Sequence, residues 1–223
     1  MGMVLRNRLV ALLIRLTILI LYLVSYGPYL AQFNSLWAGL GHFCVEIGLV
    51  AMIVMMLEVI FNLIDLIRHG VFGVPAGPYM PIGLITNVFA ILAGTIYLTY
   101  LMPGGYAPAG TFAIMFNATL LVGPLIDWLF LEEKGTVRFG LLFNGMLFPI
   151  LYHIFGYFRT VIWDDAPIFG THMYAFPFLD YTNNPHIVAA SFAYFGVILA
   201  SLVLAVFLND VLAGKYARVK AEE

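Results

Sequence analysis

The sequence predicts an all-α integral membrane protein, a bundle of six transmembrane helices with both termini in the cytoplasm. Of the 223 residues, 63% are hydrophobic and only 10% are charged, whereas roughly a quarter of the residues in a soluble domain are charged. Six apolar runs are long enough to cross a bilayer, and Gly, Pro or charged residues separate them. The basic residues gather on one side of these runs, which sets the orientation.

The six spans follow from the roughly 20 apolar residues that a helix needs to cross the hydrocarbon core. They are expected at residues 9–32, 39–67, 82–102, 111–131, 138–160 and 187–211. The second run is long enough to require tilt or an extension past the lipid. Prolines in the connections, such as Pro75 and Pro103, stop the helices from continuing. No long polar stretch remains, so residues 1–223 are expected to form a single transmembrane domain.

Orientation follows from the cations, because short cytoplasmic loops are enriched in Lys and Arg. One side of the six spans receives Arg6, Arg8, Arg15, Arg68, Lys134, Arg138, Lys215, Arg218 and Lys220. The other side has only Arg159, beside Asp164 and Asp165. Both termini are therefore expected in the cytoplasm and the long loop 161–186 outside. Arg15 is expected to snorkel to the inner interface, and because it interrupts the first apolar run we expect no signal peptide.

Composition also limits the partners. The formal net charge is −2, and no basic cluster offers the electrostatic footprint of nucleic-acid binding, so that class is excluded. Membrane lipids are the expected surroundings. The single cysteine, Cys44, cannot form a disulfide within the chain.

Polar residues recur at one depth in the outer half of the predicted bundle. With 1.5 Å of rise per residue, Glu46 lies roughly 10 Å below the outer surface, with His42, Cys44 and Asn117 at or above it and His153 at a similar height. His42 and Glu46 are four residues apart and share a helix face. A carboxylate in the bilayer is costly and usually faces the bundle interior or a water-filled cavity.

Three interpretations of these residues stay open. They can be a buried polar network that holds the helices together. They can be a catalytic constellation in which Cys44 attacks, His153 or His42 accepts its proton, and Asn117 or Glu46 orients the ring. The outer histidines with the acid can also hold a metal ion or haem. The first two interpretations need no cofactor.

A second group of polar residues lies toward the cytoplasmic side. Glu58, Asn62 and Asp65 form a stripe on the inner part of the second span, which we interpret as a helix end that reaches cytoplasmic water. Asp127 lies near the inner interface beside Trp128, where helix-end charges are common. It is expected to be an interface anchor or the partner of a cytoplasmic cation.

Two segments resemble a known family. They are "LLVGPLIDWLFLEEKGTVRFGLLFNGMLFPILYHIFGYFRTVI" and "YAFPFLDYTNNPHIVAASFAYFGVILASLVLAVFLNDVL". The matching features are Pro124, Asp127 and Trp128, the pair Phe148 and Pro149 with Tyr152, and above all "FPFLD" at 176–180. These features resemble the androgen-induced-gene family of six-span membrane proteins and its bacterial relatives, over about half of the chain.

The resemblance implies a lipid hydrolase. Animal members of that family cleave fatty acid esters of hydroxy fatty acids with an intramembrane threonine nucleophile and a histidine. By position the threonine falls at Cys44 and the histidine near Asn117, so His153 would have to replace the general base from another helix. The leading hypothesis is a lipid-ester hydrolase capped by loop 161–186.

Two alternatives from other classes are kept. The first is a non-catalytic structural or accessory subunit of a larger membrane complex, in which the aromatic loop 161–186 docks other membrane subunits. The second is a haem or metal carrier that uses the outer histidines.

Overall fold

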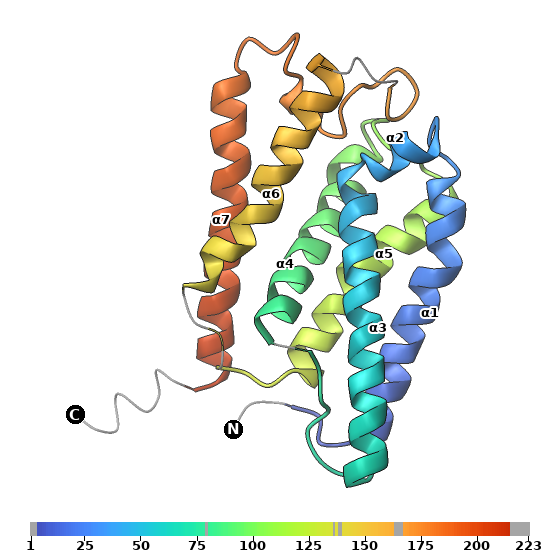
Figure 1. Cartoon of the computed structure of the whole chain (residues 1–223), viewed down its shortest axis with the longest axis vertical. Coiled ribbons are helices and arrows are strands. Elements are labelled where there is room, and N and C mark those ends of the chain that lie inside the picture. Colours follow the sequence, from blue (N-terminus) through green and yellow to red (C-terminus); the bar gives the residue numbers. More distant parts are fainter. Residues whose placement is uncertain (1–3, 79, 136, 138–139, 163–166, 215–223) are drawn as a thin grey trace, which may run out of the picture.

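The described residues of the computed structural model, 4–78, 80–135, 137, 140–162 and 167–214, are largely helical (Figure 1). The α-helices are α1 (Arg8–Leu30), α2 (Leu36–Leu40), α3 (Phe43–His69), α4 (Met80–Ile96), α5 (Thr111–Ile126), α6 (Leu141–Tyr157) and α7 (Ile187–Leu212). One π-helical turn continues each of α4, α5 and α6, namely η1 (Tyr97–Leu101), η2 (Asp127–Leu131) and η3 (Phe158–Ile162). A 3₁₀ turn, η4 (Pro177–Leu179), precedes α7.

The helices form a four-helix group and a hairpin. α1 and α4 each pack on both α3 and α5, which closes a ring of four helices. α6 and α7 lie side by side and contact this group through α4 (Figure 1). α1 begins at one end of the bundle, and α3 and η2 finish there; we call it the Arg15 end. Residues 167–186 lie at the opposite end, which we call the loop end.

Within the described part of the chain, five helices are long and apolar enough to cross a membrane, namely Arg8–Leu30, Phe43–His69, Pro81–Leu101, Thr111–Leu131 and Ile187–Leu212. They match five of the six predicted spans to within a few residues, and we treat the chain as a multi-pass membrane protein. The predicted second span, 39–67, is divided at Gly41, where α2 ends and α3 follows after a turn. The sixth, 138–160, corresponds to α6 with η3, which is not among the five.

The described basic residues lie mainly at the Arg15 end. They stand before α1, near the end of α3 and after η2, and these three parts of the chain meet at that end. Arg138, Lys215, Arg218 and Lys220, together with Asp164 and Asp165, lie outside the described residues.

Arg15 does not snorkel to the interface, so that prediction is wrong. Its side chain is 1% exposed, and its Nε donates to Asp127 Oδ1 at 2.7 Å while Nη1 donates to the Ala76 carbonyl at 2.7 Å. Glu58 Oε2 lies 3.8 Å from the same Nε. Partners on three other segments therefore satisfy the guanidinium inside the bundle, and Asp127 pairs with this buried cation.

The stripe on α3 also differs from its prediction. Glu58 and Asn62 are 2% and 0% exposed, because this part of α3 turns that face toward the neighbouring helices. Only Asp65 is partly exposed, and it pairs with Arg8 and His69. The expectation of a helix end in water therefore fits Asp65 alone.

The loop end is covered by the segment before α7. Ile168, Tyr174 and Phe176 are buried, and the Phe176 ring packs 5.1 Å from that of Phe43. Asn34 Nδ2 donates to the carbonyls of Pro167 and Gly170 at 3.1 and 2.9 Å. The large apolar side chains of the loop thus face the bundle and form a cap.

Close packing of α4 on α5 requires a glycine. A Cβ at Gly94 would lie 2.5 Å from the Asn117 carbonyl oxygen and 2.7 Å from the Leu121 backbone nitrogen. Backbone atoms cannot move aside as a flexible side chain can, so the two helices would have to separate. Small residues at such contacts are typical of membrane helices.

We predict that Gly94→Ala lowers stability by about 1–3 kcal/mol through overpacking. Gly196→Ala is the matched control, because nothing lies within 4 Å of a Cβ at that position on α7. Thermal unfolding in detergent, followed by circular dichroism, should show a lower midpoint for Gly94→Ala only. Equal midpoints for the two variants would contradict this account of the α4 and α5 contact.

Candidate active site

Three of the five predicted site residues lie in the interior of the four-helix group. Cys44 is 0% exposed, and its Sγ lies 3.5 Å from the Ala93 carbonyl oxygen, its hydrogen-bond acceptor. Asn117 Nδ2 donates to Ala113 in its own helix at 2.9 Å. His42 is buried beside Phe33, and both of its ring nitrogens lack a hydrogen-bond partner among the described residues.

The other two residues lie elsewhere. Glu46 is partly exposed. His153 lies between α6 and α7, where it contacts Tyr181 and Ser191. Among the described residues, no side-chain hydrogen bond joins any two of the five predicted residues. The structure therefore gives Cys44 no histidine to accept its proton, and a catalytic role for Cys44 stays a prediction.

His153 instead joins two hydroxyl groups. Its Nε2 lies 3.2 Å from Ser191 Oγ, and its Nδ1 lies 3.1 Å from Tyr181 Oη. Tyr181 Oη also donates to the His153 carbonyl at 2.9 Å. The result is a serine, a histidine and a third group that holds the ring, which is the arrangement of an activated nucleophile.

The two contacts of Tyr181 with His153 favour one histidine tautomer. A tyrosine hydroxyl has one proton, and Tyr181 uses its proton in the hydrogen bond to the His153 carbonyl. With that proton in place the Tyr181 oxygen accepts from Nδ1, and a neutral ring protonated at Nδ1 leaves Nε2 free to accept from Ser191 when the serine hydroxyl turns away from the Ile187 carbonyl. Burial raises the pKa of the Tyr181 phenol, helped by Tyr174 nearby, which keeps this donor protonated. The free Nε2 lone pair faces Ser191.

The serine hydroxyl has two acceptors within reach. Ser191 Oγ donates to the Ile187 carbonyl at 2.8 Å, one turn back in α7, and His153 Nε2 is the alternative acceptor at 3.2 Å. A change of one side-chain torsion therefore moves the proton from the resting contact to the general base.

A cavity of about 370 Å³ opens beside this group. Its lining is His153, Ile154, Tyr157, Phe158, Tyr181, Ile187, Val188 and Ser191. Val188 is 67% exposed on the outer surface of the hairpin, so the cavity faces the surroundings of the bundle. Its wall is apolar apart from the hydroxyls and the imidazole, which suits an ester with alkyl chains.

Ser191 also lies close to the positive end of a helix. α7 begins at Ile187, its first turn contains no acidic residue, and the side chain of His186 does not cap it. The first amides of a helix have no partner within the helix and carry partial positive charge. This field favours negative charge on an oxygen near Ser191.

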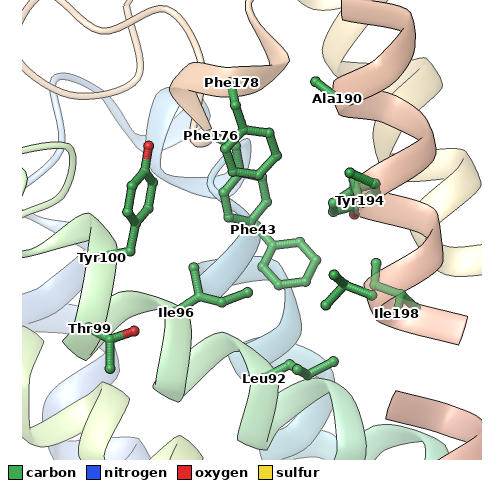
Figure 2. A pocket seen from close by; sticks show the side chains of 12 residues that line it. Phe43, Leu92, Ile96, Thr99, Tyr100, Phe176, Phe178, Ala190, Tyr194 and Ile198 are labelled. Atoms are coloured by element: carbon green, nitrogen blue, oxygen red, sulfur yellow. The ribbon is translucent and has the colours of Figure 1, made fainter. Parts of the chain in front are cut away.

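A second, larger cavity lies on another side of α7. It measures about 430 Å³ and is almost entirely apolar, with lining residues from α3, α4, η1, α7 and the segment around η4. Figure 2 shows Phe43, Ile96 and Ile198 around it, with Tyr194 at its wall. The Tyr194 ring stacks on that of His153 with 6.1 Å between centroids. Tyr194 is therefore shared by the apolar cavity and the histidine.

Sequence analysis found His153 but not its partners. Ser191 lies 38 residues from His153 and Tyr181 lies 28 residues away, so no spacing rule connects them. One signal was present, because Tyr181 directly follows "FPFLD" at 176–180. Within the described residues, the group of three with metal-ligand proximity is Glu58, Asp127 and Glu132, without a histidine.

Comparison with family models, curated proteins and solved structures finds no match to this chain. The resemblance to the androgen-induced-gene family therefore stays a prediction.

The assigned tautomer is testable by ¹⁵N NMR of histidine-labelled protein. We predict that the His153 signals are those of a neutral ring protonated at Nδ1, because Tyr181 accepts that proton. Tyr181→Phe removes the acceptor and should populate the other tautomer. Signals of the Nε2-protonated ring in the wild type would refute the assignment.

Proposed function

We propose that this chain is a six-span membrane protein that hydrolyses lipid esters, with Ser191 as nucleophile and His153 as general base. One observation carries the proposal. Ser191 Oγ, His153 Nε2 and Nδ1 and Tyr181 Oη form an unbroken series of contacts at 3.2 and 3.1 Å, beside a cavity with an apolar wall.

The sixth span in this proposal is the helix formed by α6 and η3. It runs alongside α7, whose apolar residues qualify it as a span. The described basic residues Arg6, Arg8, Arg68 and Lys134 are at the Arg15 end, which the positive-inside rule assigns to the cytoplasm. The loop end, with loop 161–186 and the proposed active site, then faces the opposite side.

The chemistry follows from the assigned proton positions. Ser191 Oγ bonds to the ester carbonyl carbon while its proton passes to His153 Nε2. The intermediate breaks its bond to the alcohol oxygen, which takes that proton and leaves. Water then gives a proton to Nε2 and attacks the acyl-serine, which releases the fatty acid and returns the proton to Ser191.

Two further features support this reaction. The first turn of α7 supplies partial positive charge where the oxyanion of the intermediate would form. Tyr181 stabilises the imidazolium by accepting from Nδ1 and fixes the ring through its bond to the His153 carbonyl. The expected family membership agrees with a lipid-ester substrate, although it places the nucleophile at Cys44.

The apolar cavity is the proposed site for an acyl chain. It adjoins α7 at Ala190, the residue before Ser191, and it offers almost no polar surface. An alkyl chain bound there would lie within one helical turn of Ser191 along α7.

Ser191→Ala should abolish hydrolysis of a medium-chain fluorogenic acyl ester by the purified protein in nanodiscs, because the nucleophile is lost. General acid and base catalysis contributes on the order of 10²–10⁴ in rate, and His153→Gln should lose a factor in that range. Ser201→Ala is the matched control, since Ser201 also bonds to the preceding turn of α7. Turnover by Ser191→Ala at the wild-type rate would exclude this mechanism.

Cys44→Ala separates the two candidate nucleophiles. The buried thiol bonds only to the Ala93 carbonyl among the described residues, so we expect this variant to retain turnover. Loss of turnover in a folded Cys44→Ala protein would instead favour the cysteine mechanism predicted from the sequence.

Ala193→Phe tests the acyl-chain site. Ala193 lines the apolar cavity, and a phenyl ring there would take up space that a long chain needs. We predict a higher KM for long-chain esters and an unchanged KM for short-chain esters. The same KM change for both chain lengths would show that the chain binds elsewhere.

A further inference from the structure

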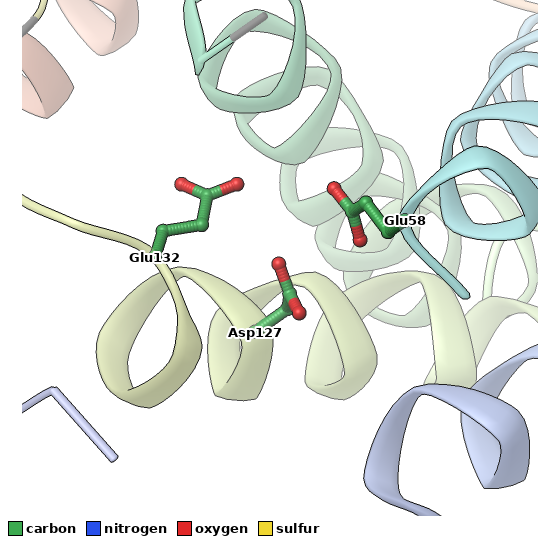
Figure 3. Close-up of side chains that lie close together, drawn as sticks. All are labelled: Glu58, Asp127 and Glu132. Carbon is green, nitrogen blue, oxygen red and sulfur yellow. The ribbon is translucent and has the colours of Figure 1, made fainter. Parts of the chain in front are cut away.

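Three carboxylates lie together with one guanidinium at the Arg15 end. We call this group, which consists of Arg15, Glu58, Asp127 and Glu132, the Arg15 cluster. Its residues come from α1, α3, η2 and the segment that follows η2. One oxygen from each of Glu58, Asp127 and Glu132 lies within 4.8 Å of the others. Figure 3 shows the three carboxylates around one shared space, with Glu58 on α3, Asp127 on η2 and Glu132 where the chain leaves η2.

Each carboxylate keeps an oxygen without a hydrogen bond. Glu58 Oε2, Asp127 Oδ2 and Glu132 Oε2 are buried and have no hydrogen-bond partner among the described residues. Arg15 occupies Asp127 Oδ1 at 2.7 Å, and Asn87 donates to Glu132 Oε1 at 3.1 Å. Glu58 Oε2 has the 3.8 Å ion pair with Arg15 Nε, whereas Asp127 Oδ2 and Glu132 Oε2 have no partner among the described residues. Buried polar atoms in proteins are nearly always satisfied, so these oxygens indicate a missing partner.

The partner that the three carboxylates lack must carry positive charge. Three carboxylates face one guanidinium, and Lys134 adds one further cation, since its Nζ bonds to the Glu132 carbonyl at 3.1 Å. If all groups are charged, one negative charge is uncompensated. A buried charge of this kind must be paired, coordinated or neutralised.

The cluster has a route for an ion. A cavity of about 240 Å³ adjoins it, lined by Arg15, Glu58 and Glu132 and by residues 74–78. Gly83 of α4 completes the wall, because a Cβ there would lie 2.9 Å from Glu132 Oε1 and 3.7 Å from Glu58 Oε1. The absence of a side chain at Gly83 leaves the space beside two of the carboxylates open.

We propose that the Arg15 cluster binds one divalent cation that prefers oxygen ligands, of the class of Mg²⁺, Ca²⁺ or Mn²⁺, through Glu58, Asp127 and Glu132. Such ions hold oxygen atoms at roughly 2.0–2.6 Å, so two ligands of one ion cannot be more than about 5 Å apart. The 4.8 Å limit of this group meets that condition. Carboxylates without Cys or His also select hard ions over Zn²⁺ or Cu²⁺.

The site is separate from the proposed esterase site at the loop end and does not depend on it. A cation here would join α3 to η2 and fix them relative to α1, so its binding should also raise thermal stability.

Mn²⁺ is the probe, because its electron paramagnetic resonance signal reports free ion directly. The purified chain, first treated with a chelator, is titrated with Mn²⁺ in detergent. We expect one saturable site per chain. The Mn²⁺ affinity of Glu132→Gln should be lower than that of the wild type by a factor of about ten or more. Asp65→Asn is the matched control, because Asp65 is an acid on α3 that pairs with Arg8 and His69 outside the cluster, and it should bind Mn²⁺ as the wild type does.

Gly83→Ala keeps every charge and tests the geometry. Its added methyl group would crowd Glu132 Oε1, so this variant should also bind Mn²⁺ more weakly. A wild-type protein without a saturable Mn²⁺ site would overturn the proposal, as would equal affinity in the wild type and Glu132→Gln. In either case a proton shared among the carboxylates would be the remaining partner.

Discussion

The fold depends on one constraint, that a polar or charged group inside a lipid-embedded bundle is costly unless another segment supplies a partner. Arg15 illustrates it most directly, since its guanidinium joins α1 to Asp127 in η2 and to the Ala76 carbonyl in the loop after α3. Removing one partner of a buried ion pair costs about 3–5 kcal/mol. The same constraint operates at the loop end, where Tyr152 donates to the Gly41 carbonyl at 3.2 Å.

The two ends of the bundle differ in how their polar groups are partnered. At the loop end Ser191, His153 and Tyr181 reach one another in pairs, so a proton can move from Ser191 to His153 without a change in net charge. At the Arg15 end the groups are charged and their number is unbalanced, which calls for an added cation. The proposed ester hydrolysis and the proposed ion binding therefore lie at opposite ends.

The sequence predicted the helices better than their rotations. Glycines, prolines and charges mark helix ends, and the predicted spans 111–131 and 187–211 agree closely with the observed helices. Rotation depends on neighbours that the sequence does not identify. Tyr152 and His153 are about 100° apart around α6, so one faces the turn at Gly41 and the other faces α7. Glu58 and Asp65 share a stripe, yet α3 buries only the first. His153 and Cys44 were expected to lie together because their predicted depths in the membrane are similar. The hydrogen-bond partners of His153 are instead Tyr181 and Ser191.

Covalent labelling tests the central claim, that Ser191 is the nucleophile, most directly. The purified chain in nanodiscs is treated with an alkyl fluorophosphonate, which reacts with serines activated by a general base, and the modified residue is located by peptide mass spectrometry. We predict a single adduct on Ser191, absent when His153 is replaced by Gln. An adduct on another residue, or none on Ser191 in protein that hydrolyses esters, would contradict the account.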